Sequence, residues 1–267
     1  MTILWVVDAF TAIPFQGNPA AVCVLDAPRD ASWMQLVARE MNLSETAFLH
    51  PIKDGWSLRW FTPTVEVDLC GHATLASAMI LWKTGELDHN EEARFLTTSG
   101  WLRCRRAGDW IEMDFPTNIA VPCPTPGGLA EALGCELVSV LRSSSDLLVE
   151  VADEATLRAL IPDFSRLMAF AVRGIIVTCR SAAAEFDFIS RFFAPSAGIA
   201  EDPVTGSAHC TLATFWQEKL GKNEFTAYQA SARGGVVKVS IQGNRILLKG
   251  QAVLMSRVEW LAPQSPE

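Results

Sequence analysis

Three short segments carry side chains that could move a proton or bind an anion. Glu45 is a carboxylate that lies between an apolar helical segment and an apolar strand. Gly71-His72 and Gly206-Ser207 each stand before an apolar helical run, and the free N–H groups at a helix start attract anions. The simpler interpretations are a surface glutamate and a helix-capping serine.

Cysteine and histidine near these segments suggest two further chemistries. Cys70 and His72 could form a Cys–His catalytic pair, or a zinc site together with His209 and Cys210. However, residues i and i+2 around a tight glycine turn rarely touch, and neighbours on a helix point apart. No C-x-x-C spacing is present. We therefore expect no metal site.

The chain contains one long motif twice. The segment 59–82 reads RWFTPTVEVDLCGHATLASAMILW, and the segment 191–216 reads RFFAPSAGIAEDPVTGSAHCTLATFW. Both begin Arg–aromatic–Phe–x–Pro, and both end in a glycine followed by a small, apolar, helix-forming run. Their arginines lie 132 residues apart, about half the chain, which favours a duplicated domain over a short repeat. If the two halves face each other, both helix starts converge on one cleft suited to a small carboxylate.

The elements that would position these residues follow from hydrophobic patterning. Residues 3–7 and 20–25 read as buried strands, 30–41 as an amphipathic helix, and 46–49 as a strand that begins just after Glu45. The segment Gly17-Asn18-Pro19 reads as a turn, although it could also place Asn18 at a substrate. The proline-rich segment 116–126 is the best linker. We expect an N-terminal half at 1–116, joined by a last strand near 257–267, and a C-terminal half at 117–256.

Composition limits the class of protein. The 267 residues are 49% hydrophobic and 19% charged, which is typical of a globular protein. The net charge of −8 argues against a nucleic-acid partner. Seven cysteines without a pairing pattern favour reduced thiols and a cytoplasmic location. The start of the chain reads as a strand, and no apolar stretch reaches the roughly 20 residues that span a bilayer.

Four motifs carry a family resemblance. DAFT…F-x-GNPAAV, NLSETAF, RWFTPTVEVDLCGHATLASA and FFAPSAGIAEDPVTGSAH resemble the PhzF-like (phenazine biosynthesis-like) isomerase family, in order and over nearly the whole chain. The resemblance implies the α/β diaminopimelate epimerase fold. In that fold two similar halves each wrap a sheet around a central helix, with the active site between them. It also implies a homodimer and no cofactor.

The resemblance also implies roles for individual residues. The glutamate of the NLSET motif, here Glu45, would be the general acid/base of a double-bond isomerisation. Further residues would line the substrate site; they are Gly71, His72, Asp202, Gly206 and Ser207. Diaminopimelate epimerase instead uses one cysteine before each central helix. This chain has Cys70 at the first position but Thr205 at the second, which argues against a two-thiol racemase.

The sequence therefore predicts a cofactor-independent isomerase that shifts a proton in a small carboxylated metabolite. Two alternatives remain open. One is a catalytically idle relative that binds a small acid or a protein, and the other is an epimerase, which would need a second base opposite Glu45. The substrate itself cannot be deduced from the sequence.

Overall fold

The computed structural model of the protein describes residues 2–261, which divide into two compact units. The N-terminal unit holds residues 1–114 and 249–267, and the C-terminal unit holds residues 115–248. Sequence patterning had put these divisions at 116/117 and 256/257. The second division falls earlier because the last strand begins at Ala252 and pairs along its length with the first strand. Residues 262–267, at the end of the expected last segment, lie outside the described residues.

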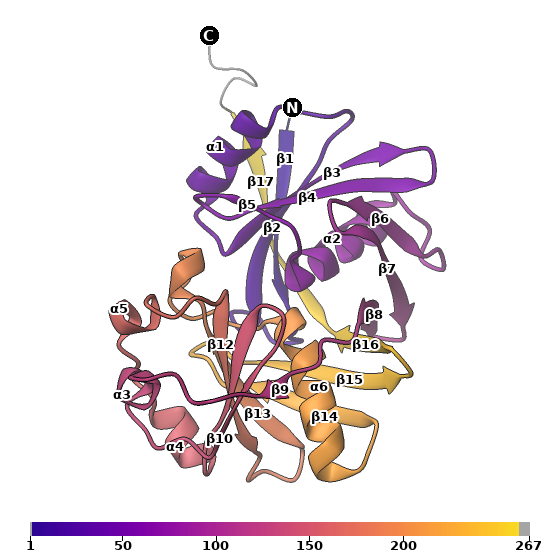
Figure 1. Ribbon diagram of the computed structural model, residues 1–267. Coiled ribbons are helices and arrows are strands. Elements are labelled where there is room, and N and C mark those ends of the chain that lie inside the picture. The colour runs from indigo at the N-terminus through magenta and orange to yellow at the C-terminus, as the bar shows by residue number, and fades with distance from the viewer. Residues whose placement is uncertain (1, 262–267) are drawn as a thin grey trace. The chain divides into compact units, whose positions relative to one another are not determined.

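The N-terminal unit joins strands from both ends of the chain. Its elements are β1 Thr2–Ala9, β2 Asn18–Val24, α1 Ala31–Met41, β3 Glu45–Ile52, β4 Gly55–Phe61, β5 Glu66–Val67, α2 Gly71–Thr84, β6 Ala93–Thr97, β7 Gly100–Ala107, β8 Trp110–Pro116 and β17 Ala252–Trp260. Antiparallel β1 lies between β2 and β17, which Figure 1 draws in yellow beside indigo β1. The strand 2–9 therefore depends on residues about 250 positions away in sequence.

The C-terminal unit is one continuous segment. Its elements are β9 Val121–Pro122, α3 Leu129–Leu133, β10 Ser139–Arg142, β11 Asp146–Glu150, α4 Glu154–Ala159, α5 Phe164–Leu167, β12 Gly174–Arg180, β13 Phe188–Phe193, the 3-10 turn η1 Pro195–Ala197, α6 Gly206–Leu220, β14 Glu224–Gln229, β15 Gly235–Gln242 and β16 Arg245–Gly250. Leucine, isoleucine, valine and phenylalanine side chains from α3, α4, α5 and strands β10 to β13 form its core.

The two units repeat one order of strand pairing. In the N-terminal unit β1–β2 is antiparallel, β2–β3 parallel, β3–β4 antiparallel, β4–β6 parallel and β6–β7 antiparallel. The series β10, β11, β12, β13, β14 and β15 repeats the same five pairings in the C-terminal unit. The long helices α2 and α6 occupy the same step in each series, before β6 and before β14. The duplication predicted from the repeated motif is therefore present in the fold.

Helix α2 is central to the N-terminal unit because small and apolar residues lie on nearly every side of it. Eleven of its 14 residues are buried, against β1, β2, β3 and β17. The buried hydroxyls of Thr74 and Ser77 donate to the carbonyls of Cys70 and Ala73, so neither is left without a partner. Gly85 ends the helix in the left-handed conformation.

The repeated arginines hold the segment that leads into each central helix. Arg59 makes two hydrogen bonds of 2.7 Å to the carboxylate of Glu66, and Arg191 makes two of 2.7 and 2.8 Å to Glu201. Each guanidinium also lies over the phenylalanine two residues along its strand, on the same face of the sheet. The repeated Arg–x–Phe pattern therefore has a structural role: each arginine ties the segment before the central helix to its strand.

Candidate functional site

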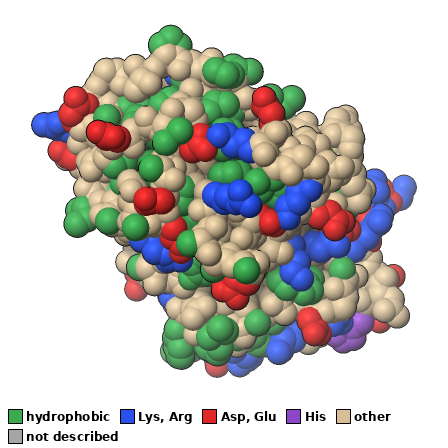
Figure 2. Space-filling view, turned by 90° about the horizontal axis from the view of Figure 1, so that it is seen from below, with side chains coloured by type: hydrophobic (Ala, Val, Ile, Leu, Met, Phe, Trp, Pro, Cys, Tyr) green, Lys and Arg blue, Asp and Glu red, His purple; other side chains and the backbone are tan. Residues whose placement is uncertain are grey.

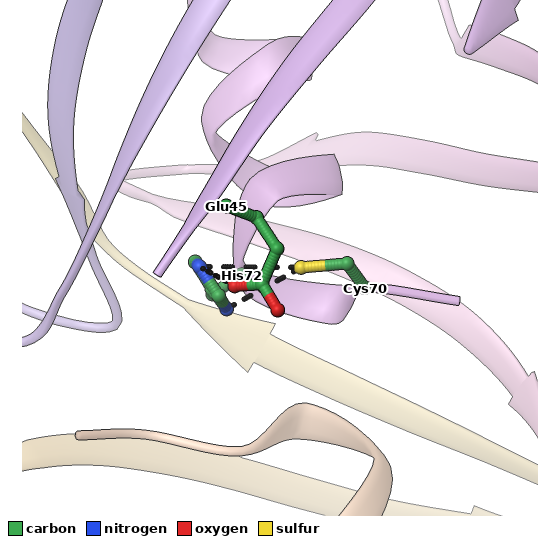
Figure 3. Close-up of side chains that lie close together, drawn as sticks. All are labelled: Glu45, Cys70 and His72. Carbon is green, nitrogen blue, oxygen red and sulfur yellow. Dashed lines mark hydrogen bonds and ion pairs between the residues drawn. The ribbon is translucent and has the colours of Figure 1, made fainter. Parts of the chain in front are cut away.

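Glu45, Cys70 and His72 lie together in the N-terminal unit (Figure 3). Glu45 is the first residue of β3, Cys70 precedes α2, and His72 is the second residue of α2. The Nε2 atom of His72 lies 3.1 Å from Oε2 of Glu45. These atoms form an ion pair without the alignment of a hydrogen bond, and Oε2 is buried with no hydrogen-bond partner among the described residues. A buried carboxylate oxygen without a hydrogen bond is uncommon and calls for a functional explanation.

Asn18 belongs to the same cluster, so the interpretation of its segment as a plain turn is wrong. It is the first residue of β2 and is completely buried. Its amide nitrogen Nδ2 lies 3.1 Å from Nδ1 of His72. The parallel pairing of β2 with β3 brings Asn18 near Glu45, and only this long-range pairing could reveal it.

The cluster sets the protonation of its members. Burial alone lowers the pKa of His72, but Cys70 and Glu45 outweigh it, and the pKa of His72 lies well above its usual 6.5. Burial, together with the negative charge of Glu45, raises the pKa of Cys70 to about 11, although His72 opposes this. At neutral pH the thiol of Cys70 is therefore neutral, and the neighbouring Glu45 favours the protonated form of His72.

The expectation that Cys70 and His72 do not touch is wrong. The Sγ atom of Cys70 lies 3.5 Å from Nδ1 and 3.9 Å from Nε2 of His72, because the extended backbone of Cys70 turns its side chain back toward the helix. The contact does not activate the thiol, since the thiolate is the nucleophilic form and the pKa of Cys70 is about 11.

The same three residues could in principle hold a metal ion, because their ligand atoms lie within 4.8 Å of one another. Metal ligation needs a thiolate and a neutral imidazole. The raised pKa values of Cys70 and His72 favour the opposite protonation states. The cluster therefore fits proton handling better than metal binding.

The other predicted site residues lie in the C-terminal unit. Gly206 is the first residue of α6 and Ser207 the second, matching Gly71 and His72 in α2. Asp202 is buried and accepts a hydrogen bond of 2.5 Å from the hydroxyl of Thr205. The completely buried Gln229 then bonds both residues: its Oε1 accepts from the backbone N–H of Thr205 at 2.8 Å, and its Nε2 donates to the carbonyl of Asp202 at 2.7 Å.

Ser207 does not cap α6, so that simpler interpretation is wrong. The residue that precedes the helix is Thr205, and the hydroxyl of Ser207 instead accepts a hydrogen bond of 3.0 Å from Nη1 of Arg173. Arg173 in turn donates to both oxygens of the buried Asp146, at 2.9 and 2.5 Å. Sequence reasoning missed Arg173 because it is a single arginine in a loop and belongs to no motif.

His209 and Cys210, the other two candidate zinc ligands, contact backbone carbonyls at the start of their own helix. The Nδ1 atom of His209 lies 2.8 Å from the carbonyl of Thr205, and the thiol of Cys210 faces the carbonyl of Gly206. Burial lowers the pKa of His209 to about 4, against the effect of its hydrogen bond. His209 is thus a neutral core residue. All seven cysteines are free thiols.

Comparison with known proteins identifies the family. Residues 7–257 match the family described as phenazine biosynthesis-like protein. The chain belongs to this family. It is 55% identical over 261 residues to an uncharacterized isomerase of Halalkalibacterium halodurans, covering 97% of this chain and 98% of that protein. The resemblance drawn from the motifs is therefore confirmed.

Solved structures confirm the predicted fold class of this family member. A PhzF-family phenazine biosynthesis protein of Enterococcus faecalis superimposes with a TM-score of 0.90 at 38% identity, covering 96% of this chain and 97% of that one. A probable proline racemase of Agrobacterium radiobacter K84 superimposes with a TM-score of 0.68 at 12% identity, covering 100% of this chain and 95% of that one. That likeness shows the shared epimerase-type fold alone.

Surface charge and helix hydropathy are two further features of the protein. Lys and Arg side chains are interspersed with Asp and Glu on the face that Figure 2 shows, so the charge there is mixed. Among residues 2–261, no helix is both long and apolar enough to cross a bilayer.

Proposed function

We propose that this protein is a cofactor-independent isomerase that shifts a proton, and with it a double bond, in a small carboxylated metabolite. Glu45 is the general acid/base of this reaction. The observation that carries the proposal is the buried Oε2 of Glu45, which has no hydrogen-bond partner among the described residues and lies 3.1 Å from Nε2 of His72. The names of relatives as isomerases agree with this assignment.

One carboxylate suffices for the reaction. Glu45 takes a proton from a carbon next to an electron-withdrawing group, and the electron pair left behind forms the new double bond. The same carboxyl group then returns the proton to the far end of the conjugated system, so nothing is oxidised or reduced. His72 supplies a positive charge beside the carboxylate while Glu45 is ionised. Gly71, Asp202, Gly206 and Ser207 are proposed to hold the substrate.

The contacts weigh against an epimerase with two thiol bases. A second base would have to be Cys70 or its counterpart Thr205. The pKa of Cys70 is about 11, so its thiol stays protonated at neutral pH. Thr205 is not a thiol, and its hydroxyl donates to Asp202. An idle binding protein is the remaining alternative, and only an activity measurement separates it from an isomerase.

The test is deuterium exchange with Glu45→Gln. Small carboxylated metabolites are first screened for binding and then followed by NMR in D₂O. The variant keeps the size and polarity of the side chain but cannot accept the proton. We expect turnover and deuterium incorporation to fall by about 10²–10⁴-fold while binding is retained, as for loss of a positioned acid/base.

Glu40→Gln is the matched control, because Glu40 is an exposed glutamate on α1 in the same unit. It should exchange deuterium at the wild-type rate. Exchange by Glu45→Gln at the wild-type rate would refute the assignment and leave His72 as the next candidate base. Binding by the wild-type protein without any exchange would support the idle alternative.

A further inference from the structure

Arg173 is the most strongly held charged group beside a predicted substrate-binding residue. Its Nε and Nη2 atoms donate to Oδ1 and Oδ2 of Asp146, a carboxylate that is 0% exposed. Its guanidinium also lies over the ring of Phe192, 5.4 Å from the ring centroid. Its side chain nevertheless remains 37% exposed. A fixed guanidinium that still reaches solvent is well placed to recognise a ligand.

Arg191 is held in a similar way and offers a comparison for Arg173. Both side chains make two hydrogen bonds to one carboxylate and lie over a phenylalanine ring. The Nη1 atom of Arg191 donates to two backbone carbonyls, so four of the five N–H groups of that guanidinium donate within the described chain. The Nη1 atom of Arg173 instead donates to the hydroxyl of Ser207.

The Arg173–Ser207 contact fixes the polarity of the hydroxyl. Arginine has five N–H donors and no acceptor, so the oxygen of Ser207 must accept and its hydrogen must point to another acceptor. Three of the five N–H groups of Arg173 donate within the described chain, which leaves two. Arg173 and Ser207 together therefore present only donors to a ligand.

The duplicated fold gives this pair a position that corresponds to the acid/base cluster. In the N-terminal unit the cluster comes from the starts of β2, β3 and α2, as Asn18, Glu45 and His72. In the C-terminal unit the corresponding starts are those of β11, β12 and α6. They carry Asp146, Arg173 immediately before β12, and Ser207. The N-terminal unit thus has the carboxylate of Glu45 at the start of β3, and the C-terminal unit has the guanidinium of Arg173 at the corresponding start of β12.

We infer that Arg173 is a specificity-determining residue that, with Ser207, selects a substrate by a carboxylate group. Charge-assisted hydrogen bonds from a guanidinium are about twice as strong as neutral ones, so a carboxylate is favoured over the corresponding amide. Asp146 positions the guanidinium and stays behind it, shielded from the ligand. The inference rests on the proposed function for the identity of the site, but it concerns binding and not proton transfer.

The experiment measures binding of matched acid and amide probes by calorimetry or ligand-observed NMR. The probes are the pairs fumarate and fumaramide, and benzoate and benzamide. We expect the wild-type protein to prefer the acid of at least one pair by about 10-fold or more, since a hydrogen bond to a charged group contributes about 1.5–3 kcal/mol. Arg173→Lys keeps the charge beside Asp146 but loses the planar fork, and should reduce the preference to about 3-fold or less.

Further variants keep the test decisive. Arg173→Met leaves Asp146 buried without its partner and is expected to unfold easily, so Arg173→Gln/Asp146→Asn removes both charges together. Ser207→Ala should lower the preference without loss of stability. Arg166→Met is the matched control, because Arg166 is an exposed arginine of the same unit that also pairs with a carboxylate, that of Asp163. It should bind both probes as the wild-type protein does.

The outcomes separate this inference from the proposed function. Absence of acid preference in both pairs, or a preference that survives in Arg173→Lys and in the double variant, would overturn the role of Arg173. Glu45→Gln should keep the preference. A protein that selects carboxylates through Arg173 but exchanges no deuterium would support the inference and contradict the isomerase.

Discussion

Two buried histidines show how contacts between side chains decide protonation. His72 lies beside Glu45 and Cys70, and the pKa of His72 is raised well above 6.5 although burial opposes this. His209 lies beside a backbone carbonyl and the aromatic ring of Phe188, and burial lowers the pKa of His209 to about 4. The contacts of the first histidine therefore favour its protonated form beside Glu45, whereas the second is a neutral part of the core.

The thiol of Cys70 is predicted to be dispensable for the chemical step. Cys70→Ala should keep solvent-deuterium exchange within about 10-fold of the wild-type rate, because a thiol of pKa about 11 is not the base at neutral pH. Exchange rates of this variant and of Glu45→Gln, measured side by side, provide the check. A loss in Cys70→Ala as large as that in Glu45→Gln would restore the thiol as a base.

His209 is predicted to make the fold sensitive to acid. Its folded-state pKa of about 4 lies below the usual 6.5, so the unfolded state binds the proton first as pH falls. The stability that it contributes is present above pH 6.5 and is lost progressively as pH falls toward 4, by roughly 3 kcal/mol. Urea unfolding at pH 7, 5.5 and 4 measures this, with His209→Gln lacking that share of the acid loss. Equal acid loss in the variant would contradict the prediction, and His89→Gln, at an exposed position, is the control.

At the scale of elements, the central helix of the N-terminal unit positions the cluster of Asn18, Glu45 and His72. Helix α2 carries His72 at its start, and its next turns pack against the strands that begin with Asn18 and Glu45. Leu75 is fully buried one turn after His72, and its side chain reaches Gly250 at the end of β16. The packing that stabilises this unit therefore also fixes the geometry of the cluster.

Truncating a buried leucine of α2 should destabilise the protein more than truncating an exposed leucine. Leu75→Ala is expected to lower the free energy of unfolding by about 2–5 kcal/mol, as large cavities in a core do. Leu36→Ala, on the half-exposed face of α1, should change it by no more than about 0.5 kcal/mol. Urea denaturation curves of the two variants measure the difference, and equal effects would refute the assignment of α2 as a rigid support.

At the scale of the whole molecule, the N-terminal unit depends on the last strand of the chain. Strand β17 pairs antiparallel with β1, from Ala9 opposite Ala252 to Thr2 opposite Trp260, with one irregularity after Val6. The C-terminal unit is continuous in sequence and contains no residue of β1 or β17. The homodimer implied by the family resemblance stays a prediction.

A chain that ends at Gly250 should therefore lose order in the N-terminal unit alone. Hydrogen exchange followed by mass spectrometry should show amides of β1 and β2 losing protection by at least about 10-fold, because β1 becomes an unpaired edge. Peptides from β12 and β13 should keep theirs. A chain that ends at Leu261 retains β17 and is the control. Equal loss of protection in both units would contradict the division.

Much of the fold could be predicted from the sequence because it depends on local patterns. The apolar runs after Gly71 and Gly206 specify helices that are surrounded by protein, and the repeated Arg–x–Phe pattern reveals the duplication. Glu45 could be placed at a strand start from the end of one hydrophobic period and the beginning of another. These features need only neighbours within a few turns of the chain.

The contacts of the candidate site were decided by tertiary structure. Asn18 meets His72 across 54 positions, and Arg173 reaches Ser207 across 34. Neither contact follows from local periodicity, because parallel strand pairing and crossover helices bring them together. Protonation depends on the same contacts: the raised pKa values of His72 and Cys70 arise only when burial and neighbouring groups act together. The sequence by itself determined which residues could do chemistry, and the tertiary structure decided which of them lie in contact.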